Sequence, residues 1–204
     1  MAASVLGTIP PEHTAFWTEL GRFISYYSIV EEQINFLVRK YYNISRRISN
    51  IAFGTLRYDA AVEHLNRLRH ADLIPDDEWA EIGNLKDQMG LITRLRNDLV
   101  HYPASPTSKS EFVVSTKLWA YVENKIRMHI VSTQILDDAT TDLFKIFMRL
   151  TILHRPGERA AFEQLWGALL REPWRYKPLA PTSPYPTRPS SRRGRRNRRA
   201  PSPK

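Results

Sequence analysis

The sequence predicts an all-α helical bundle that carries a disordered basic tail. Apolar residues recur every three or four positions over long stretches with few glycines or prolines, which is typical of amphipathic helices, and no convincing run of strands interrupts them. The last segment, 173–204, contains eight of the fourteen prolines, ten basic residues and no acid. We therefore expect a helical domain over 1–172 and a disordered Pro/Arg-rich tail over 173–204.

Four principal helices and one short helix are expected. The first principal helix begins near Pro10 and Pro11, because prolines and the acid that follows them suit a first turn, and it ends near Tyr42. Its apolar face steps by three or four residues and comprises Phe16, Leu20, Phe23, Tyr27, Val30, Ile34, Leu37 and Tyr41. The short helix is predicted over 58–70.

The second principal helix is expected to start at the acidic run 75–78, whose charges favour a helix N-terminus. It should stop before Pro103. The composition of residues 102–110 predicts a loop, and residues 111–116 are expected to form a short extended piece.

The two remaining principal helices are predicted over 117–153, with a bend at Asp137 and Asp138, and over 157–170. Two of the four principal helices would exceed about thirty residues if unbroken. Helices of that length offer more apolar wall than a compact bundle of this size needs, which favours self-association through a helix face.

Charge is distributed unevenly along the chain. The net charge is +9, but the basic residues of the tail leave 20 basic and 21 acidic residues in 1–172, which is nearly neutral.

No cysteine occurs, which excludes a disulfide framework, a thiolate metal site and a cysteine nucleophile. The N-terminus does not resemble a signal peptide and no apolar stretch approaches about 20 residues, so we expect a cytoplasmic protein with no membrane partner.

Residues that could carry chemistry lie near the end of the second principal helix. There Arg96 is followed directly by Asn97 and, five positions on, by His101. A guanidinium offers a permanent charge and a fork of donors to phosphate oxygens, while a histidine exchanges protons near neutral pH. We therefore expect RNA cleavage by the strand's own 2′-hydroxyl, with His101 moving a proton and Asn97 holding the phosphate or orienting the histidine.

The other histidines show no spacing of a metal site, so neither a metal nor another cofactor is expected: His13, His64, His70, His129 and His154.

On an ideal helix, Arg96 and His101 lie about 140° apart around the axis. A frayed helix end before Pro103 could bring them together, as could a second copy of the chain across a two-fold axis. The second arrangement would gather two arginines and two histidines in one cleft.

The segment from Arg96 to His101 resembles the motif of HEPN domains, in which an arginine and a histidine are separated by four to six residues and a polar residue, often asparagine, follows the arginine. HEPN domains are small all-α bundles with the motif at the C-terminal end of a later helix. The resemblance covers about residues 12–153.

The resemblance implies a metal-independent endoribonuclease that acts as a homodimer and leaves a 2′,3′-cyclic phosphate. Arg96 and His101 match the catalytic pair, and Asn97 matches the supporting polar position. Family members often serve as toxins or as antiphage and stress-defence effectors, which would add an antitoxin or regulatory protein to the partners. One subgroup, silenced by nucleotidylation, has a tyrosine two residues after the histidine; Pro103 stands there, so such silencing is not expected.

Two other interpretations stay open. A helix C-terminus favours a histidine through its dipole, and Arg96 could pair with Asp98, Asp87 or another carboxylate in a purely structural role. The domain could also be a non-catalytic HEPN-like dimerisation or interaction module with a nucleic-acid-binding tail.

The tail itself holds a dense group of arginines: Arg192, Arg193, Arg195, Arg196, Arg198 and Arg199. Such a segment attracts RNA or DNA phosphates with little sequence preference, although it could also be a solubilising end. Because it contains no compensating acid, we expect it to tether RNA near a domain that is not itself basic.

Overall fold

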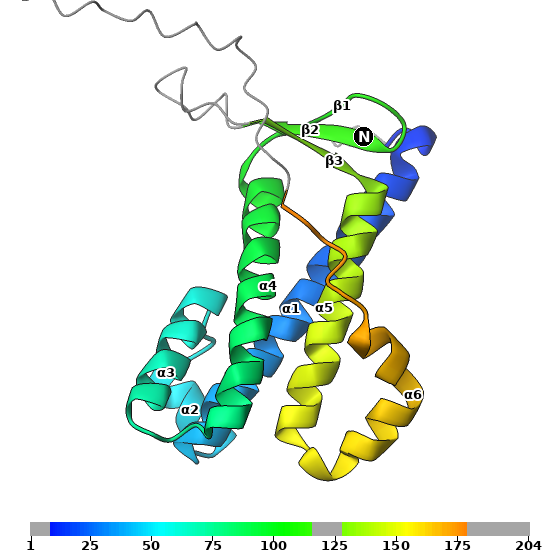
Figure 1. Ribbon diagram of the computed structural model, residues 1–204. Helices are drawn as coiled ribbons and strands as arrows, with labels where there is room; N and C mark the ends of the chain where they lie inside the picture. The colour runs from blue at the N-terminus through cyan, green and yellow to red at the C-terminus, as the bar shows by residue number, and fades with distance from the viewer. Residues whose placement is uncertain (1–8, 116–127, 179–204) are drawn as a thin grey trace, which may run out of the picture.

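The computed structural model describes residues 9–115 and 128–178, and within them the chain forms six α-helices and one three-stranded sheet (Figure 1). The helices are α1 (Thr14–Tyr42), α2 (Arg46–Phe53), α3 (Tyr58–His70), α4 (Asp76–His101), α5 (Thr133–His154) and α6 (Arg159–Arg171), with single 3-10 turns at Pro11–His13 and Pro156–Glu158. The strands are β1 (Ala104–Pro106), β2 (Glu111–Ser115) and β3 (Met128–Ser132). The fold is predominantly helical, as predicted, but it is not all-α.

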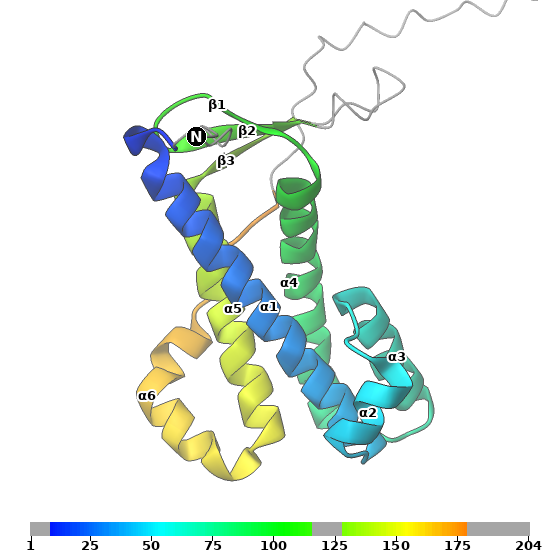
Figure 2. The ribbon, with the colours of Figure 1, turned by 180° about the vertical axis from the view of Figure 1, so that it is seen from behind.

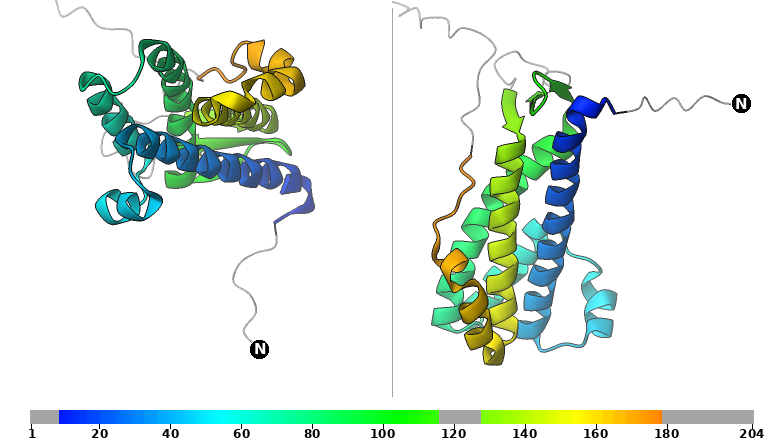
Figure 3. Two further views of the ribbon diagram at one scale, coloured as in Figure 1. Left: turned by 90° about the horizontal axis from the view of Figure 1, so that it is seen from below. Right: turned by 90° about the vertical axis from the view of Figure 1, so that its right-hand side faces the viewer.

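The long helices α1 and α5 pack side by side, and α4 lies against α5 (Figures 1 and 2). The sheet covers one end of these helices, and α2 and α3 lie at the other end. Helix α6 packs on α5, on the side of the long helices away from α2 and α3 (Figure 3). One continuous apolar core joins α1, α3, α4, α5 and the inner face of the sheet.

Four predicted helices are confirmed, and one of them is α6, which spans Arg159–Arg171 where a helix was predicted over 157–170. The apolar stripe of the first predicted helix is the buried face of α1, where Phe16, Phe23 and Leu37 are fully buried. Asn43 adopts a left-handed conformation (φ 52°) and ends this helix, as is common after a helix C-terminus. Helix α3 spans the predicted residues 58–70, and α4 ends at His101, two residues before Pro103.

Helix α2 was not predicted, because its sequence carries no inward apolar stripe. Ser49 is its one buried residue, while Ile48 and Ile51 are exposed. Local hydrogen bonding starts the helix instead: the Ser45 hydroxyl accepts from the Ile48 N–H at 3.3 Å. Gly54, with φ 61°, ends it.

The prediction of one helix over 117–153 is wrong in its N-terminal part. Residues 116–127 lie outside the described residues, residues 128–132 form β3, and α5 begins at Thr133. β3 pairs antiparallel with β2, so Val131 lies opposite Phe112 and is buried with it. β-Branched residues fit a strand as well as they fit a helix period, and the partner strand decides between them.

The boundary between helix and strand is set by Ser132, whose hydroxyl accepts from the Ile135 N–H at 3.3 Å and so begins α5. From there α5 runs unbroken to His154, without the bend predicted at Asp137 and Asp138. The extended piece predicted over 111–116 is confirmed over Glu111–Ser115 as β2, and residue 116 lies outside the described residues. The loop predicted over 102–110 contains β1, which pairs with β2.

The segment after α6 packs on the domain, although residues 173–178 belong to the predicted tail. Asp142 of α5, which is fully buried, holds this segment. Its carboxylate accepts the backbone N–H groups of Arg175 at 3.0 Å and Tyr176 at 2.8 Å, and the Gln88 amide of α4 at 2.9 Å. The side chain of Tyr176 is buried in the core. The domain therefore extends beyond residue 172.

Lys145, one turn along α5, completes the network around Asp142. Its ammonium group is fully buried and lies 3.6 Å from the Asp142 carboxylate and 3.8 Å from that of Glu172. It also donates to the Pro173 carbonyl at 3.0 Å. The buried charges are thus paired and hydrogen-bonded, which is the condition under which buried charges are tolerated. Residues 179–204, the rest of the predicted tail, lie outside the described residues.

None of the helices in 9–115 and 128–178 is both long enough and apolar enough to cross a membrane.

Candidate functional site

Arg96 lies in the last two turns of α4 and is half-buried against α1. Its guanidinium carbon lies 5.4 Å from the centre of the Tyr27 ring, and its Nη1 donates to the Asn97 side-chain oxygen at 3.1 Å. Its Nε is buried without a hydrogen-bond partner. Among the described residues no carboxylate forms an ion pair with it, so the pairing with Asp87 or Asp98 that would make Arg96 purely structural is not formed.

The ring beneath Arg96 is fixed by the core. The Tyr27 hydroxyl lies 3.1 Å from the Thr93 hydroxyl, which donates to the Met89 carbonyl at 2.8 Å. Burial raises the pKa of Tyr27 to about 12. Tyr27 is therefore neutral at physiological pH and acts as a rigid support for the guanidinium, not as a proton donor or acceptor.

Alkaline pH should weaken the fold through buried tyrosines. Burial raises the pKa of Tyr27 and of Tyr176 from 10.0 to about 12. The unfolded chain therefore loses these protons first, so the contribution of these two tyrosines to stability should be constant below pH 10 and fall between pH 10 and about 12. Thermal unfolding across this range measures the effect, and the Tyr27→Phe, Tyr176→Phe double variant should show a shallower fall. An equally steep fall in that variant would contradict this assignment.

His101 is the last residue of α4 and is exposed. The helix is regular up to this point, since the Tyr102 N–H donates to the Asp98 carbonyl at 3.0 Å. The fraying that would swing His101 toward Arg96 is therefore not present, and the two residues keep the angular separation of about 140° expected of a helix. Arg96 and Asn97 are hydrogen-bonded to each other, whereas His101 of the same chain lies on a different side of α4 from Arg96.

A histidine that the sequence did not single out lies beside the motif. His129 of β3 points its Nε2 at the Asp98 carboxylate, 3.5 Å away, and its side chain is only 16% exposed. Asn97, Asp98 and His129 share the wall of a cavity of about 400 Å³ with Arg94 of α4. Nothing in the local sequence indicates this contact, because it depends on β3 pairing where a helix was predicted.

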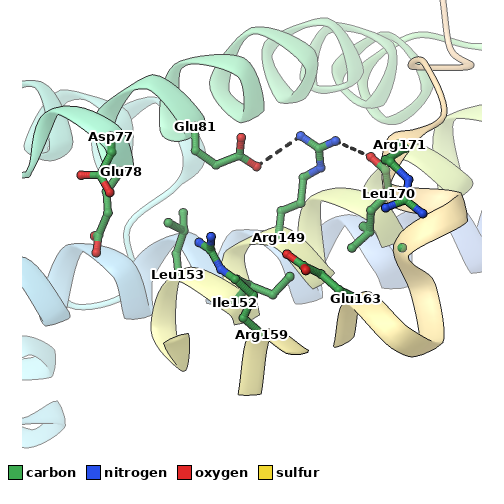
Figure 4. Close-up of a pocket in the computed structure, with 11 residues that line it drawn as sticks. Asp77, Glu78, Glu81, Arg149, Ile152, Leu153, Arg159, Glu163, Leu170 and Arg171 are labelled. Carbon is green, nitrogen blue, oxygen red and sulfur yellow. Dashed lines mark hydrogen bonds and ion pairs between the residues drawn. The ribbon is translucent and has the colours of Figure 1, made fainter. Parts of the chain in front are cut away.

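A separate cavity of about 460 Å³ lies between α4, the end of α5 and α6 (Figure 4). Arg149 crosses one side of it, donating to Glu81 at 3.2 Å and to the Leu170 carbonyl. Arg159 and Glu163 of α6 also line it. Both acidic and basic groups line its wall, so it has no strong preference for one sign of ligand. We assign Arg149 the structural role of fastening α6 to α4.

No group of three or more histidine, aspartate or glutamate side chains that could hold a metal ion occurs in the described ranges. The six arginines predicted to bind nucleic acid lie outside those ranges: Arg192, Arg193, Arg195, Arg196, Arg198 and Arg199.

Comparison with known proteins gives no match to a protein-family model, to a curated protein or to a solved structure.

Proposed function

We propose that the protein is a metal-independent endoribonuclease of HEPN type that works as a homodimer. Arg96 and His101 are its catalytic pair, and Asn97 is the supporting residue. The observation that carries the proposal is the state of Arg96 among the described residues: it is half-buried, held against Tyr27, hydrogen-bonded to Asn97, and not paired with a carboxylate. A charge in that position is neutralised when an anion binds, and a phosphodiester matches its fork of donors.

The homodimer is proposed because the two side chains lie on different sides of α4. His101 cannot reach the Arg96 side of its own regular helix, but a second copy across a two-fold axis brings His101 of one chain to Arg96 of the other. Val100, next to His101, is a large apolar residue that is 49% exposed. Contact between the two copies would cover this side chain.

The chemistry needs no group beyond these side chains. His101 of one chain takes the proton of the 2′-hydroxyl as its oxygen bonds to phosphorus, and returns the proton to the 5′-oxygen as the bond between that oxygen and phosphorus breaks. Arg96 donates to the phosphate oxygens as charge accumulates on them. The products are a 2′,3′-cyclic phosphate and a free 5′-hydroxyl. The arginine tail would tether RNA to the domain, and the activity suits a toxin or defence effector under the control of a regulatory protein.

Cleavage of a defined RNA in EDTA tests the proposal. We expect the purified full-length protein to cut the RNA, to leave 2′,3′-cyclic ends, and to spare the same strand with 2′-O-methyl groups, which lacks the attacking hydroxyl. Loss of cleavage in EDTA, or cleavage of the 2′-O-methyl strand, would contradict this mechanism. No cleavage under any condition would instead favour the non-catalytic interaction module.

A further inference from the structure

A polar cavity of about 640 Å³ lies between α1, α2 and the segment that leads into α3. Three arginines from these three segments line it: Arg39 of α1, Arg46 of α2, and Arg57, which directly precedes α3. Hydroxyl and amide groups complete much of the wall, contributed by Ser28, Asn35, Ser49, Asn50 and Thr55. The cavity is distinct from the surroundings of Arg96 and from the cavity beside α6.

The arginines of this cavity have no carboxylate partner among the described residues. In the part of the chain that the structure describes, none of the three forms an ion pair. Two acids line the same cavity, but the Glu31 carboxylate accepts the Tyr58 N–H at 3.1 Å, which caps the start of α3. Glu32 attracts Arg39 electrostatically without pairing with it. The cavity thus retains an excess of positive charge.

Arg39 is held in place before any ligand binds. Its guanidinium carbon lies 4.1 Å from the centre of the Phe36 ring, one turn earlier on α1. Burial and the neighbouring charge of Arg46 lower the pKa of Arg39 below its ordinary value. Two like charges brought close together destabilise each other, and a bound anion removes that cost. The site is therefore preorganised for a negatively charged ligand.

We propose that Arg39, Arg46 and Arg57 form a second RNA contact, which binds a phosphate of the substrate strand away from the cleaved bond. This proposal rests on the proposed ribonuclease function and specifies where its substrate lies. Guanidinium forks with nearby hydroxyl and amide donors match phosphate oxygens, and the cavity is open and wide enough for one nucleotide unit.

The position along α1 agrees with this role. Ser28, at one end of the cavity, directly follows Tyr27, which supports Arg96. Arg39 lies about 18 Å beyond Tyr27 along the axis of α1, a length that a few nucleotides of single-stranded RNA can span.

Binding of a 2′-O-methyl RNA to the full-length protein tests the site without requiring cleavage. The Arg39→Ala, Arg46→Ala double variant should bind at least about tenfold more weakly than wild type, since charge-assisted hydrogen bonds are lost. Its plot of log affinity against log salt should be less steep by about 0.7, because one phosphate contact is lost. The matched control is the Arg159→Ala, Arg171→Ala double variant, which loses the same charge from the cavity beside α6 and should bind nearly as wild type. Unchanged melting temperatures would show that both variants fold.

Equal weakening in both double variants would overturn the proposal, because it would reflect net charge alone. A second result would also overturn the RNA contact: inorganic phosphate or a mononucleotide stabilises wild type but not the Arg39→Ala, Arg46→Ala variant, while RNA binding is unchanged. That result would assign the cavity to a small phosphate compound. The ribonuclease proposal is tested separately. If RNA binds through this site but is never cut, the catalytic function is contradicted and the proposed RNA contact is not.

Discussion

Replacing His101 by alanine is expected to slow RNA cleavage about 10²–10⁴-fold, which is the usual contribution of a positioned acid or base. Arg96→Ala should cost about 10²–10³-fold, because the charge that develops on the phosphate loses its donors. Arg96→Lys should stay strongly impaired, since an ammonium group keeps the charge but not the planar fork. Initial rates of cleavage with a labelled RNA in EDTA measure each effect.

Controls for these variants come from the same chain. His70→Ala removes an exposed histidine from the last turn of α3, and Arg159→Ala removes an exposed arginine from α6. Both should cut RNA as fast as wild type. Because Arg96 is half-buried, its variants also require a melting temperature, and a folded Arg96→Ala that cuts RNA normally would remove Arg96 from the mechanism.

Replacing Asp142 by alanine is expected to lower the free energy of unfolding by about 3–5 kcal/mol, because the fully buried Lys145 loses its buried partner and keeps only the partly exposed Glu172 carboxylate, 3.8 Å away. The backbone N–H groups of Arg175 and Tyr176 would also lose their acceptor, so the segment after α6 should detach. Urea unfolding measures the change in stability, and amide exchange at Tyr176 reports the detachment.

Asp137 offers the matched control for Asp142. It lies on the same helix and pairs with Arg22 on the surface, where both side chains are more than 40% exposed. Asp137→Ala should therefore cost about 0–1 kcal/mol. Adding Lys145→Met to Asp142→Ala should recover part of the loss by removing the buried charge. Equal effects of Asp137→Ala and Asp142→Ala would show that the buried network does not fasten the segment.

Helices with one apolar stripe could be predicted from the sequence, and those without one could not. The stripes of α1 and α3 follow the helical period, so their bounds are close to those predicted. Helix α2 depends on a Ser45 cap and leaves its isoleucines exposed, so periodicity gives no sign of it. β3 was predicted as helix because its partner strand lies elsewhere in the chain.

Contacts between distant residues explain the other differences. Pro173–Tyr176 looks like the tail in composition, yet its backbone is held by Asp142, a contact across more than thirty residues. For the candidate site, the sequence predicts Arg96 beside Asn97, but not the Tyr27 ring beneath Arg96 or the contact of Asp98 with His129. Both contacts join separate elements, which local periodicity does not report.

A mixed dimer tests most directly whether Arg96 of one chain works with His101 of the other. Arg96→Ala and His101→Ala chains would be coexpressed with different affinity tags, and dimers that carry both tags would be purified. Each chain alone lacks one member of the pair, but the mixed dimer keeps one Arg96 and one His101 on opposite chains. We expect it to recover about half of the wild-type cleavage rate, because one of the two equivalent pairs is intact. A doubly tagged dimer as inactive as either single variant would contradict a site shared between two chains.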